Sequence, residues 1–406
     1  MKFPPIKEQM DLLSRGVEKF VSPEELEQKL IRSEKTGKPL RVKLGADPSR
    51  PDLHIGHAVV LRKLRQFQDL GHHAILIIGD FTAAIGDPTG RNKTRPHISL
   101  KDAQQFGKSY VEQATLVLDA QDLEVVHNST WLSKMSFRDV IELAAQYTVA
   151  QMLERDDFSK RYKSGVPISI HEFLYPLAQA QDSVALKVDV ELGGTDQLFN
   201  LLVGRELQRQ AGQDAQIILT MPLLEGTDGK EKMSKSMDNY VGLTEAPDQM
   251  YGKILSIPDD LIIKYFLLTT NVAPGRIEEI KQAMEAGANP RDYKRELARA
   301  LVGLYYDENA AREAETAFDR LFIKKQIPDD MPEYVLTAES SRRTIVDVLT
   351  AGNILDSRSE VRRMIKQNAV SVDDEKINDE HFHFEPGTES IVKVGKRKFL
   401  RVICAS

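Results

Sequence analysis

Two short segments carry residues whose types and spacing suit phosphate chemistry. The first, residues 54–57, reads HIGH and places His54 and His57 on one face of a helical turn. Gly56 between them has no side chain that would keep a nucleotide from the backbone. Free N–H groups and the helix dipole at such a start favour an anion. We therefore expect a nucleotide phosphate here; exposed capping histidines and half of a metal site are the alternatives.

The second segment, residues 232–236, reads KMSKS and follows the turn-rich residues 226–229. Its two lysines, Lys232 and Lys235, are three residues apart, and Ser236 adds a hydroxyl group. Two ammonium groups in a mobile loop can stabilise the negative charge that develops on a leaving pyrophosphate. A lysine-rich loop taken alone is more often a solvated surface, so this segment gains its meaning from the first.

A strand, a helix and a second strand surround the first segment. Residues 39–44 read as a short strand, residues 55–70 repeat apolar side chains at helical spacing, and residues 74–78 form a continuous apolar run. This order is a βαβ unit. We therefore predict an α/β fold with a Rossmann-like parallel sheet, to which residues 216–219 add a later strand.

The pattern changes further along the chain. We predict a Rossmann-like catalytic domain over residues 1–246, including the KMSKS loop, and a helical domain over residues 247–325. Residues 326–340 are rich in proline and acidic residues and read as a linker. Residues 341–406 predict a small α+β domain, with two short helices followed by short strands.

The composition excludes several classes of protein. Of the 406 residues, 41% are hydrophobic and 29% are charged, as in globular proteins. No apolar run is long enough for a membrane span, and the first ten residues lack the apolar core of a signal peptide. Cys404 is the only cysteine, which excludes an internal disulfide and a cysteine-rich zinc site. We expect a cytoplasmic protein that does not bind membranes.

An early HIGH segment followed by a late KMSKS segment resembles the class I aminoacyl-tRNA synthetases. By that resemblance, His54 and His57 stabilise the α-phosphate of ATP under attack, and Lys232 and Lys235 stabilise the departing pyrophosphate. The resemblance implies ATP carrying Mg²⁺ as a substrate, and we expect no protein-bound metal. Neither a covalent enzyme intermediate nor a general base is required, because positioning and charge can carry the first step.

The middle of the chain points to the amino acid. Tyr175, Gln179 and Asp182 share one helical face, and residues 193–197 supply a flexible turn followed by a carboxylate. Buried structural polar residues are the alternative for each. Together these segments resemble the tyrosyl-tRNA synthetases. By this resemblance Asp182 accepts the phenol O–H of the substrate, so phenylalanine would leave a buried carboxylate unpaired.

The same resemblance assigns the remaining positions. Tyr175 and Gln179 hold the α-ammonium group of tyrosine. The full set implied for tyrosine is Thr82, Asp87, Tyr175, Gln179, Asp182 and Gln197. The set implied for ATP is Gly45, Asp47, Ser49, His54, Gly56, His57, Arg91, Arg95, Gly194, Asp196, Lys232, Lys235 and Ser236. Within that set, Gly194 and Asp196 bind the ribose of the adenylate.

Two positions depart from the pattern. Many bacterial members of the family have a tyrosine as a second phenol partner where this chain has Lys43, and a threonine where it has Ser49. The Lys43 form resembles a second bacterial subgroup. It leaves the second phenol contact open and does not affect the role of Asp182.

Residues 341–406 resemble the RNA-binding domain first described in small-subunit ribosomal protein S-four. Cationic residues recur along one predicted helix and at the final hairpin: Arg358, Arg362, Arg363, Lys366, Lys393, Lys396, Arg397, Lys398 and Arg401. Such cations position phosphates without reading sequence. A solvated helix face is the alternative. The resemblance as a whole implies tRNA(Tyr), L-tyrosine and ATP as partners, and a homodimer.

Three other functions share part of this pattern. Tryptophanyl-tRNA synthetases carry the same two segments but are not expected to have this set of Tyr175, Gln179 and Asp182. Nucleotidyltransferases of the cytidylyltransferase type have a similar histidine segment but need neither the KMSKS loop nor an RNA-binding tail. The third is a synthetase-like protein that binds RNA without catalysis, which the intact HIGH and KMSKS residues disfavour.

Overall fold

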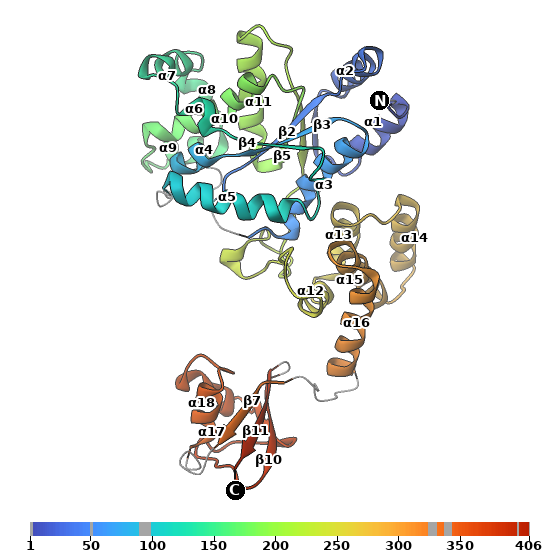
Figure 1. The fold of residues 1–406 in the computed structure, drawn as a ribbon, viewed down its shortest axis with the longest axis vertical. Helices are drawn as coiled ribbons and strands as arrows, with labels where there is room; N and C mark the ends of the chain where they lie inside the picture. Colours follow the sequence, from blue (N-terminus) through green and yellow to red (C-terminus); the bar gives the residue numbers. More distant parts are fainter. Residues whose placement is uncertain are drawn as a thin grey trace. The chain divides into compact units, whose positions relative to one another are not determined.

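The computed structural model describes residues 3–48, 52–88, 99–323, 331–336, 343–395 and 398–405. The chain forms two compact units, Met1–Arg312 and Glu313–Ser406 (Figure 1). The longer helices of the first unit are α1 (Ile6–Ser14), α2 (Pro23–Thr36), α3 (Ile55–Asp69), α5 (Leu100–Ala114), α7 (Phe137–Ala144), α9 (Asp156–Lys163), α10 (Ile170–Leu186) and α11 (Leu198–Gln210). Shorter ones are α4 (Asp80–Ile85), α6 (Ser129–Leu132) and α8 (Val149–Met152).

A six-stranded sheet forms the core of the first unit, in the order β1-β6-β5-β2-β3-β4. Its strands are β1 (Lys19–Val21), β2 (Arg41–Ala46), β3 (His73–Ile78), β4 (Leu123–His127), β5 (Val190–Gly194) and β6 (Ile217–Met221). All neighbours are parallel except the edge strand β1, which pairs antiparallel with β6. The predicted parallel sheet is confirmed. Its central strands are largely buried because both faces of the sheet are covered; every residue of β6 is buried.

The strand order reverses between β2 and β5. From β2 the chain moves outward through β3 and β4, and it returns to the other side of β2 for β5 and β6. Helices that connect such strands diverge at this point and leave a crevice at the carboxyl ends of the strands, where open α/β sheets bind ligands. The HIGH segment begins α3, which follows β2 and packs on β2, β3 and β5.

The predicted helical region follows the sheet. It contains α12 (Pro247–Leu255), α13 (Ile262–Thr269), α14 (Pro274–Glu285), α15 (Pro290–Tyr305) and α16 (Glu308–Phe318). Proline stands at the first position of α12, α14 and α15, where its missing N–H costs no helical hydrogen bond. Helix α13 packs on α3 and α15, so α12 to α15 belong to the same unit as the sheet, whereas α16 crosses the boundary between the two units.

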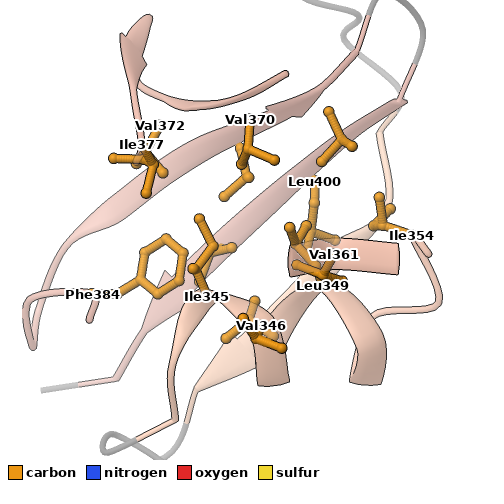
Figure 2. Close-up of a cluster of buried hydrophobic side chains, with 14 of the residues drawn as sticks. Ile345, Val346, Leu349, Ile354, Val361, Val370, Val372, Ile377, Phe384 and Leu400 are labelled. Carbon is orange, nitrogen blue, oxygen red and sulfur yellow. The ribbon is translucent and has the colours of Figure 1, made fainter. Parts of the chain in front are cut away.

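The second unit has a five-stranded sheet in the order β7-β11-β10-β8-β9. Its elements are β7 (Glu333–Leu336), α17 (Ile345–Ala351), α18 (Arg358–Lys366), β8 (Val370–Val372), β9 (Glu375–Lys376), β10 (Glu389–Val394) and β11 (Lys398–Cys404). Figure 2 shows Leu349 of α17 and Val361 of α18 close to Leu400 of the sheet, in one apolar core. The predicted helix pair and strands are present.

The stretch read as a linker, residues 326–340, contains a strand that sequence reasoning missed. Strand β7 pairs in parallel with β11, and Leu336 is buried in the core of the second unit. The proline-rich composition hid it, because a four-residue edge strand has too few residues to show alternation. The boundaries proposed between the domains stay predictions. No helix in the described part of the chain is long and apolar enough to cross a membrane.

Candidate active site

A cavity of about 430 Å³ opens at the carboxyl ends of β2, β3 and β5. Its wall contains all the described candidates for ATP and tyrosine: Gly45, Asp47, His54, Gly56, His57, Thr82, Asp87, Tyr175, Gln179, Asp182, Gly194, Asp196, Gln197, Lys232, Lys235 and Ser236. The folded chain therefore brings residues from five separate segments to one site. Ser49, Arg91 and Arg95 lie outside the described residues.

The two histidines of the HIGH segment form a tight pair at the start of α3. Their ring centres are 3.8 Å apart, and the backbone N–H of His54 donates to Nδ1 of His57 at 3.2 Å. Burial, the neighbouring His57 and the charge of Lys232 lower the pKa of His54 to about 2. His57 is more exposed than His54, but desolvation by the surrounding protein and the charge of Lys232 still hold its pKa below the ordinary value. Both rings are therefore neutral at pH 7.

The packing around position 56 also requires a glycine there, apart from the access it gives to the backbone. A Cβ at this position would lie 3.0 Å from Nδ1 of His54 and 3.6 Å from Cβ of Met233. The absence of a side chain thus lets the His54 ring and the KMSKS loop pack against the first turn of α3. Ile55 also donates its backbone N–H to the carbonyl of Val241 at 2.9 Å, which ties the HIGH segment to the chain after KMSKS.

Hydrogen bonds to Asn239 fix the shape of the KMSKS loop. Its side-chain oxygen accepts from the backbone N–H of Ser234 at 2.8 Å, and its amide donates to Asp228 at 3.1 Å. Gly229 supplies the left-handed conformation of the turn, with φ of +67°. Lys232 lies 3.3 Å from Asp196, and Lys235 pairs with Asp52. Both ammonium groups thereby reach the cavity.

Tyr240 links the second lysine of this loop to the helical region. The ring centre of Tyr240 lies 5.4 Å from Nζ of Lys235 and 4.7 Å from Nζ of Lys253 on α12. Lys253 also pairs with Glu245 at 2.5 Å, and Glu245 accepts the backbone N–H of Gly242 at 3.0 Å. Sequence reasoning missed Tyr240 because an aromatic residue a few positions after a motif carries no signal of its own.

Asp182 lies at the buried end of the cavity with both carboxylate oxygens engaged. Nε1 of Trp131 donates to one oxygen at 2.8 Å, and Nδ2 of Asn128 donates to the other at 3.3 Å. Burial raises the pKa of Asp182 to about 7, against the charge of Lys43 and the two donors, which lower it. Sequence reasoning missed Trp131 and Asn128, which follow β4 and show no motif.

A chain of amides and carboxylates crosses the cavity wall from Gln179 to Asp87. Asn200 on α11 donates to Oε1 of Gln179 at 3.1 Å and to Oε1 of Gln197 at 3.0 Å. Gln197 then donates to Asp87 at 2.8 Å, and Arg155 lies 3.5 Å from the same carboxylate. Each amide therefore has one defined orientation. Asn200 and Arg155 are additions to the predicted set.

Tyr175, predicted to bind tyrosine, contacts Asp47, which the family resemblance assigned to ATP. Its hydroxyl donates to Oδ2 of Asp47 at 2.9 Å, and Thr82 donates to Oδ1 of the same residue at 2.7 Å. Asp47 follows β2, whereas Tyr175 lies on α10. The tyrosine and ATP candidates thus share one hydrogen-bond network and are not two separate groups.

The cationic candidates of the second unit differ in their surroundings. Arg358, Arg362 and Arg363 are exposed on α18, with carboxylate partners at 2.6, 2.9 and 3.5 Å. Lys366 is exposed on the same helix. Lys398 instead donates to the carbonyl of Ile354 at 2.7 Å, a contact within the unit.

The hairpin cations that the structure describes also have partners within the unit. Nζ of Lys393 lies 5.4 Å from the ring centre of Phe399. Arg401 pairs with Glu333 at 3.4 Å and with Glu389 at 3.3 Å. Lys396 and Arg397 lie outside the described residues. Among the cations that the structure describes, those of helix α18 are therefore the more accessible group.

Known proteins match both units. Residues 34–323 match the family described as tRNA synthetases class I (W and Y), and residues 323–402 match the tyrosine–tRNA ligase SYY-like C-terminal domain. A tyrosine–tRNA ligase of Salinibacter ruber is 54% identical over 405 residues, which is 99% of this chain and 98% of that protein. One from Chlorobium chlorochromatii is 56% identical over 403 residues, 99% of each chain. This chain belongs to the tyrosine–tRNA ligase family.

Solved structures of more distant tyrosyl-tRNA synthetases share the fold. A crystal structure from Archaeoglobus fulgidus, complexed with L-tyrosine, is 24% identical, with a TM-score of 0.62 over 76% of this chain and 99% of that one. A C-terminally truncated mitochondrial enzyme from Coccidioides posadasii is also 24% identical, with a TM-score of 0.61 over 77% and 91%. The family's fold therefore extends over most of this chain.

Proposed function

We infer that the chain is a tyrosine–tRNA ligase, which activates L-tyrosine with ATP and transfers it to the 3′ end of tRNA(Tyr). One observation carries this inference. The histidines and lysines suited to phosphate chemistry line the same cavity as Asp182, the buried carboxylate suited to a phenol. Membership of the tyrosine–tRNA ligase family supports the choice of amino acid over tryptophan.

In the first step, a carboxylate oxygen of tyrosine attacks the α-phosphorus of ATP. The bond to the bridging oxygen breaks, and pyrophosphate leaves with the negative charge. The neutral ring of His57 donates a hydrogen bond to the α-phosphate, beside His54. Lys232 and Lys235 stabilise the pyrophosphate, because cations act most strongly where charge develops. Mg²⁺ enters with ATP as part of the substrate.

Three groups of residues hold the substrates in line for this attack. Asp182 accepts the phenol O–H at the buried end of the cavity. Around the α-ammonium and carboxylate of tyrosine are Thr82, Asp87, Tyr175, Gln179 and Gln197. Around the nucleotide are Gly45, Asp47, Ser49, Gly56, Arg91, Arg95, Gly194, Asp196 and Ser236. Asp196 accepts from the ribose hydroxyls, and an added Cβ on Gly194 would lie 2.8 Å from Asp196, which supports close approach there.

In the second step, a hydroxyl of the terminal ribose of tRNA attacks the carbonyl carbon of tyrosyl-adenylate, and AMP leaves. The exposed cations of α18 hold phosphates of the tRNA. Arg358, Arg362, Arg363 and Lys366 form that group, with Lys396, Arg397 and Lys398 as further candidates. The contacts position the RNA; they do not select its bases.

A homodimer is the expected assembly, and an apolar surface supports it. Large apolar side chains on α7 to α10 are exposed by more than half: Phe137, Ile141, Val149, Tyr162 and Ile170. These helices lie together at one end of the first unit, away from α13–α15 (Figure 1). Exposed groups of this kind mark protein interfaces. Light scattering on Phe137→Glu with Ile170→Glu should give a monomer; a dimer that persists would contradict the assignment.

An ATP–pyrophosphate exchange assay with each of the twenty amino acids tests the function. We expect exchange with tyrosine, followed by charging of tRNA(Tyr). Exchange with tryptophan would favour the related synthetase, and RNA binding without any exchange would favour a non-catalytic protein. Membership of the second bacterial subgroup and a cytoplasmic location stay predictions.

A further inference from the structure

Lys43 and Glu191 form a buried ion pair behind the wall of the tyrosine pocket. Nζ of Lys43 lies 3.0 Å from Oε1 of Glu191, and each side chain is 1% exposed. The two residues stand opposite each other in the register of β2 and β5, the strands between which the sheet reverses. Lys43 does not line the cavity among the described residues. It therefore does not replace the second phenol partner that other family members have.

The pair holds the stretch of α10 on which Asp182 stands. Nζ of Lys43 donates to the backbone carbonyl of Gln179 at 3.3 Å, and the Gln179 amide donates to Glu191 at 3.3 Å. Ser183, the next residue after Asp182, donates to the other oxygen of Glu191 at 3.1 Å. Both sides of Asp182 are thus anchored to one buried carboxylate.

We propose that Lys43 and Glu191 are positioning residues for tyrosine recognition, which orient Gln179 and set the charge that Asp182 presents to the phenol. This proposal rests on the proposed function, in which Asp182 accepts the phenol O–H. Neither residue contacts the substrate, so each acts through its neighbours on α10.

The charges that act on Asp182 come from two strands and oppose each other. Lys43 on β2 lowers the pKa of Asp182, and Glu191 on β5 raises it. The remaining close groups, Trp131 and Asn128 after β4, are neutral donors that lower it. Burial leaves the pKa of Asp182 near 7. An ionised carboxylate accepts the phenol more strongly, so tyrosine affinity is full above this pH and falls as the pH drops through it.

Because Lys43 and Glu191 carry opposite charges, removing each charge should shift the pH dependence of tyrosine affinity in opposite directions. Trp131 is the only tryptophan and donates to Asp182, so its fluorescence reports tyrosine binding at each pH. Lys43→Gln should raise the midpoint of the profile by about one pH unit, and Glu191→Gln should lower it by a similar amount. At pH 7, Lys43→Gln should then bind tyrosine roughly fivefold more weakly, because the ionised fraction of Asp182 falls from about a half to about a tenth. The double variant should return toward the wild-type midpoint.

A matched ion pair controls for the loss of buried charge. Lys29 and Asp189 lie 3.2 Å apart, Asp189 immediately precedes β5, and neither residue lines the cavity. Lys29→Gln and Asp189→Asn should leave the midpoint unchanged. Circular dichroism shows whether each variant is folded. If Lys43→Gln is not, the Glu191→Gln and double variants still show in which direction the midpoint shifts.

Two results would overturn the proposal. One is a midpoint that stays fixed in Lys43→Gln and Glu191→Gln while affinity falls equally at every pH, as expected of a purely structural pair. The other is a shift of both variants in the same direction. A wild-type protein that binds another amino acid and not tyrosine would instead refute the function itself, which separates the two failures.

Discussion

The backbone N–H of His54 donates to Nδ1 of His57 at 3.2 Å, which fixes the tautomer of the His57 ring. A neutral imidazole that accepts at Nδ1 carries its proton on Nε2. Because its pKa is held below the ordinary value, His57 stays neutral at physiological pH. His57, in the first turn of α3, therefore presents the neutral Nε2–H group to the cavity as a hydrogen-bond donor.

This donor predicts a difference between two substitutions of His57. Glutamine keeps an N–H near the position of Nε2, whereas alanine removes it. We expect His57→Ala to slow pyrophosphate exchange by about 100-fold and His57→Gln to slow it much less, since one donor to a developing charge contributes that much. Wild-type activity should show no loss between pH 8 and 6 from these histidines. Equal loss in both variants would contradict the donor role.

Lys235 should matter for adenylate formation and not for tyrosine binding. Pre-steady-state assays on Lys235→Ala should show adenylate formation slowed by about 100-fold with an unchanged Kd for tyrosine, because the cation meets charge only on pyrophosphate. Lys230, exposed on the same loop, is the matched control, and Lys230→Ala should change neither value. A rise in the Kd for tyrosine equal to the loss of rate would refute this role.

Tyr240 should act through its ring. A cation beside an aromatic face gains about 1 kcal/mol, so Tyr240→Leu should slow exchange by several-fold through a less ordered Lys235. Tyr240→Phe keeps the face and should behave as wild type. Both variants should bind tyrosine normally. The idea fails if the phenylalanine variant is as slow as the leucine variant, since the hydroxyl would then be the group that matters.

Asp182 should determine the choice between tyrosine and phenylalanine. A hydrogen bond to a charged group contributes about 1.5–3 kcal/mol, so Asp182→Asn should weaken tyrosine binding roughly 10- to 100-fold. Phenylalanine should be affected far less, because it offers no donor to this carboxylate. Exchange assays with both amino acids measure the ratio. An equal loss for both would show that the substitution disturbs the pocket as a whole.

The cations of α18 should bind phosphates without base preference. Arg363→Ala should weaken tRNA binding and reduce the slope of log affinity against log salt by about one, since one fewer counterion is released. Lys376→Ala, on the exposed strand β9, supplies a charge-matched control that should leave the slope unchanged. A change confined to one tRNA sequence would argue for base recognition instead.

The local elements follow from the sequence because their signals are local. The apolar run of β3 and the helical spacing of α3 predicted both elements within a few residues of their bounds. Strand β7 was missed, because its four residues gain their stability from pairing with β11, more than sixty positions away. A strand that is stabilised mainly by pairing with a distant strand cannot be predicted from its own few residues.

The sequence by itself determined the reaction type, since HIGH and KMSKS bring the required groups together within a few residues each. It also placed Tyr175, Gln179 and Asp182 on one face of a helix. Only the tertiary structure decided what surrounds Asp182: Trp131, Asn128 and the Lys43–Glu191 pair. These come from three different strands or their ends, and a sheet brings distant segments into register by hydrogen bonds that no local pattern encodes.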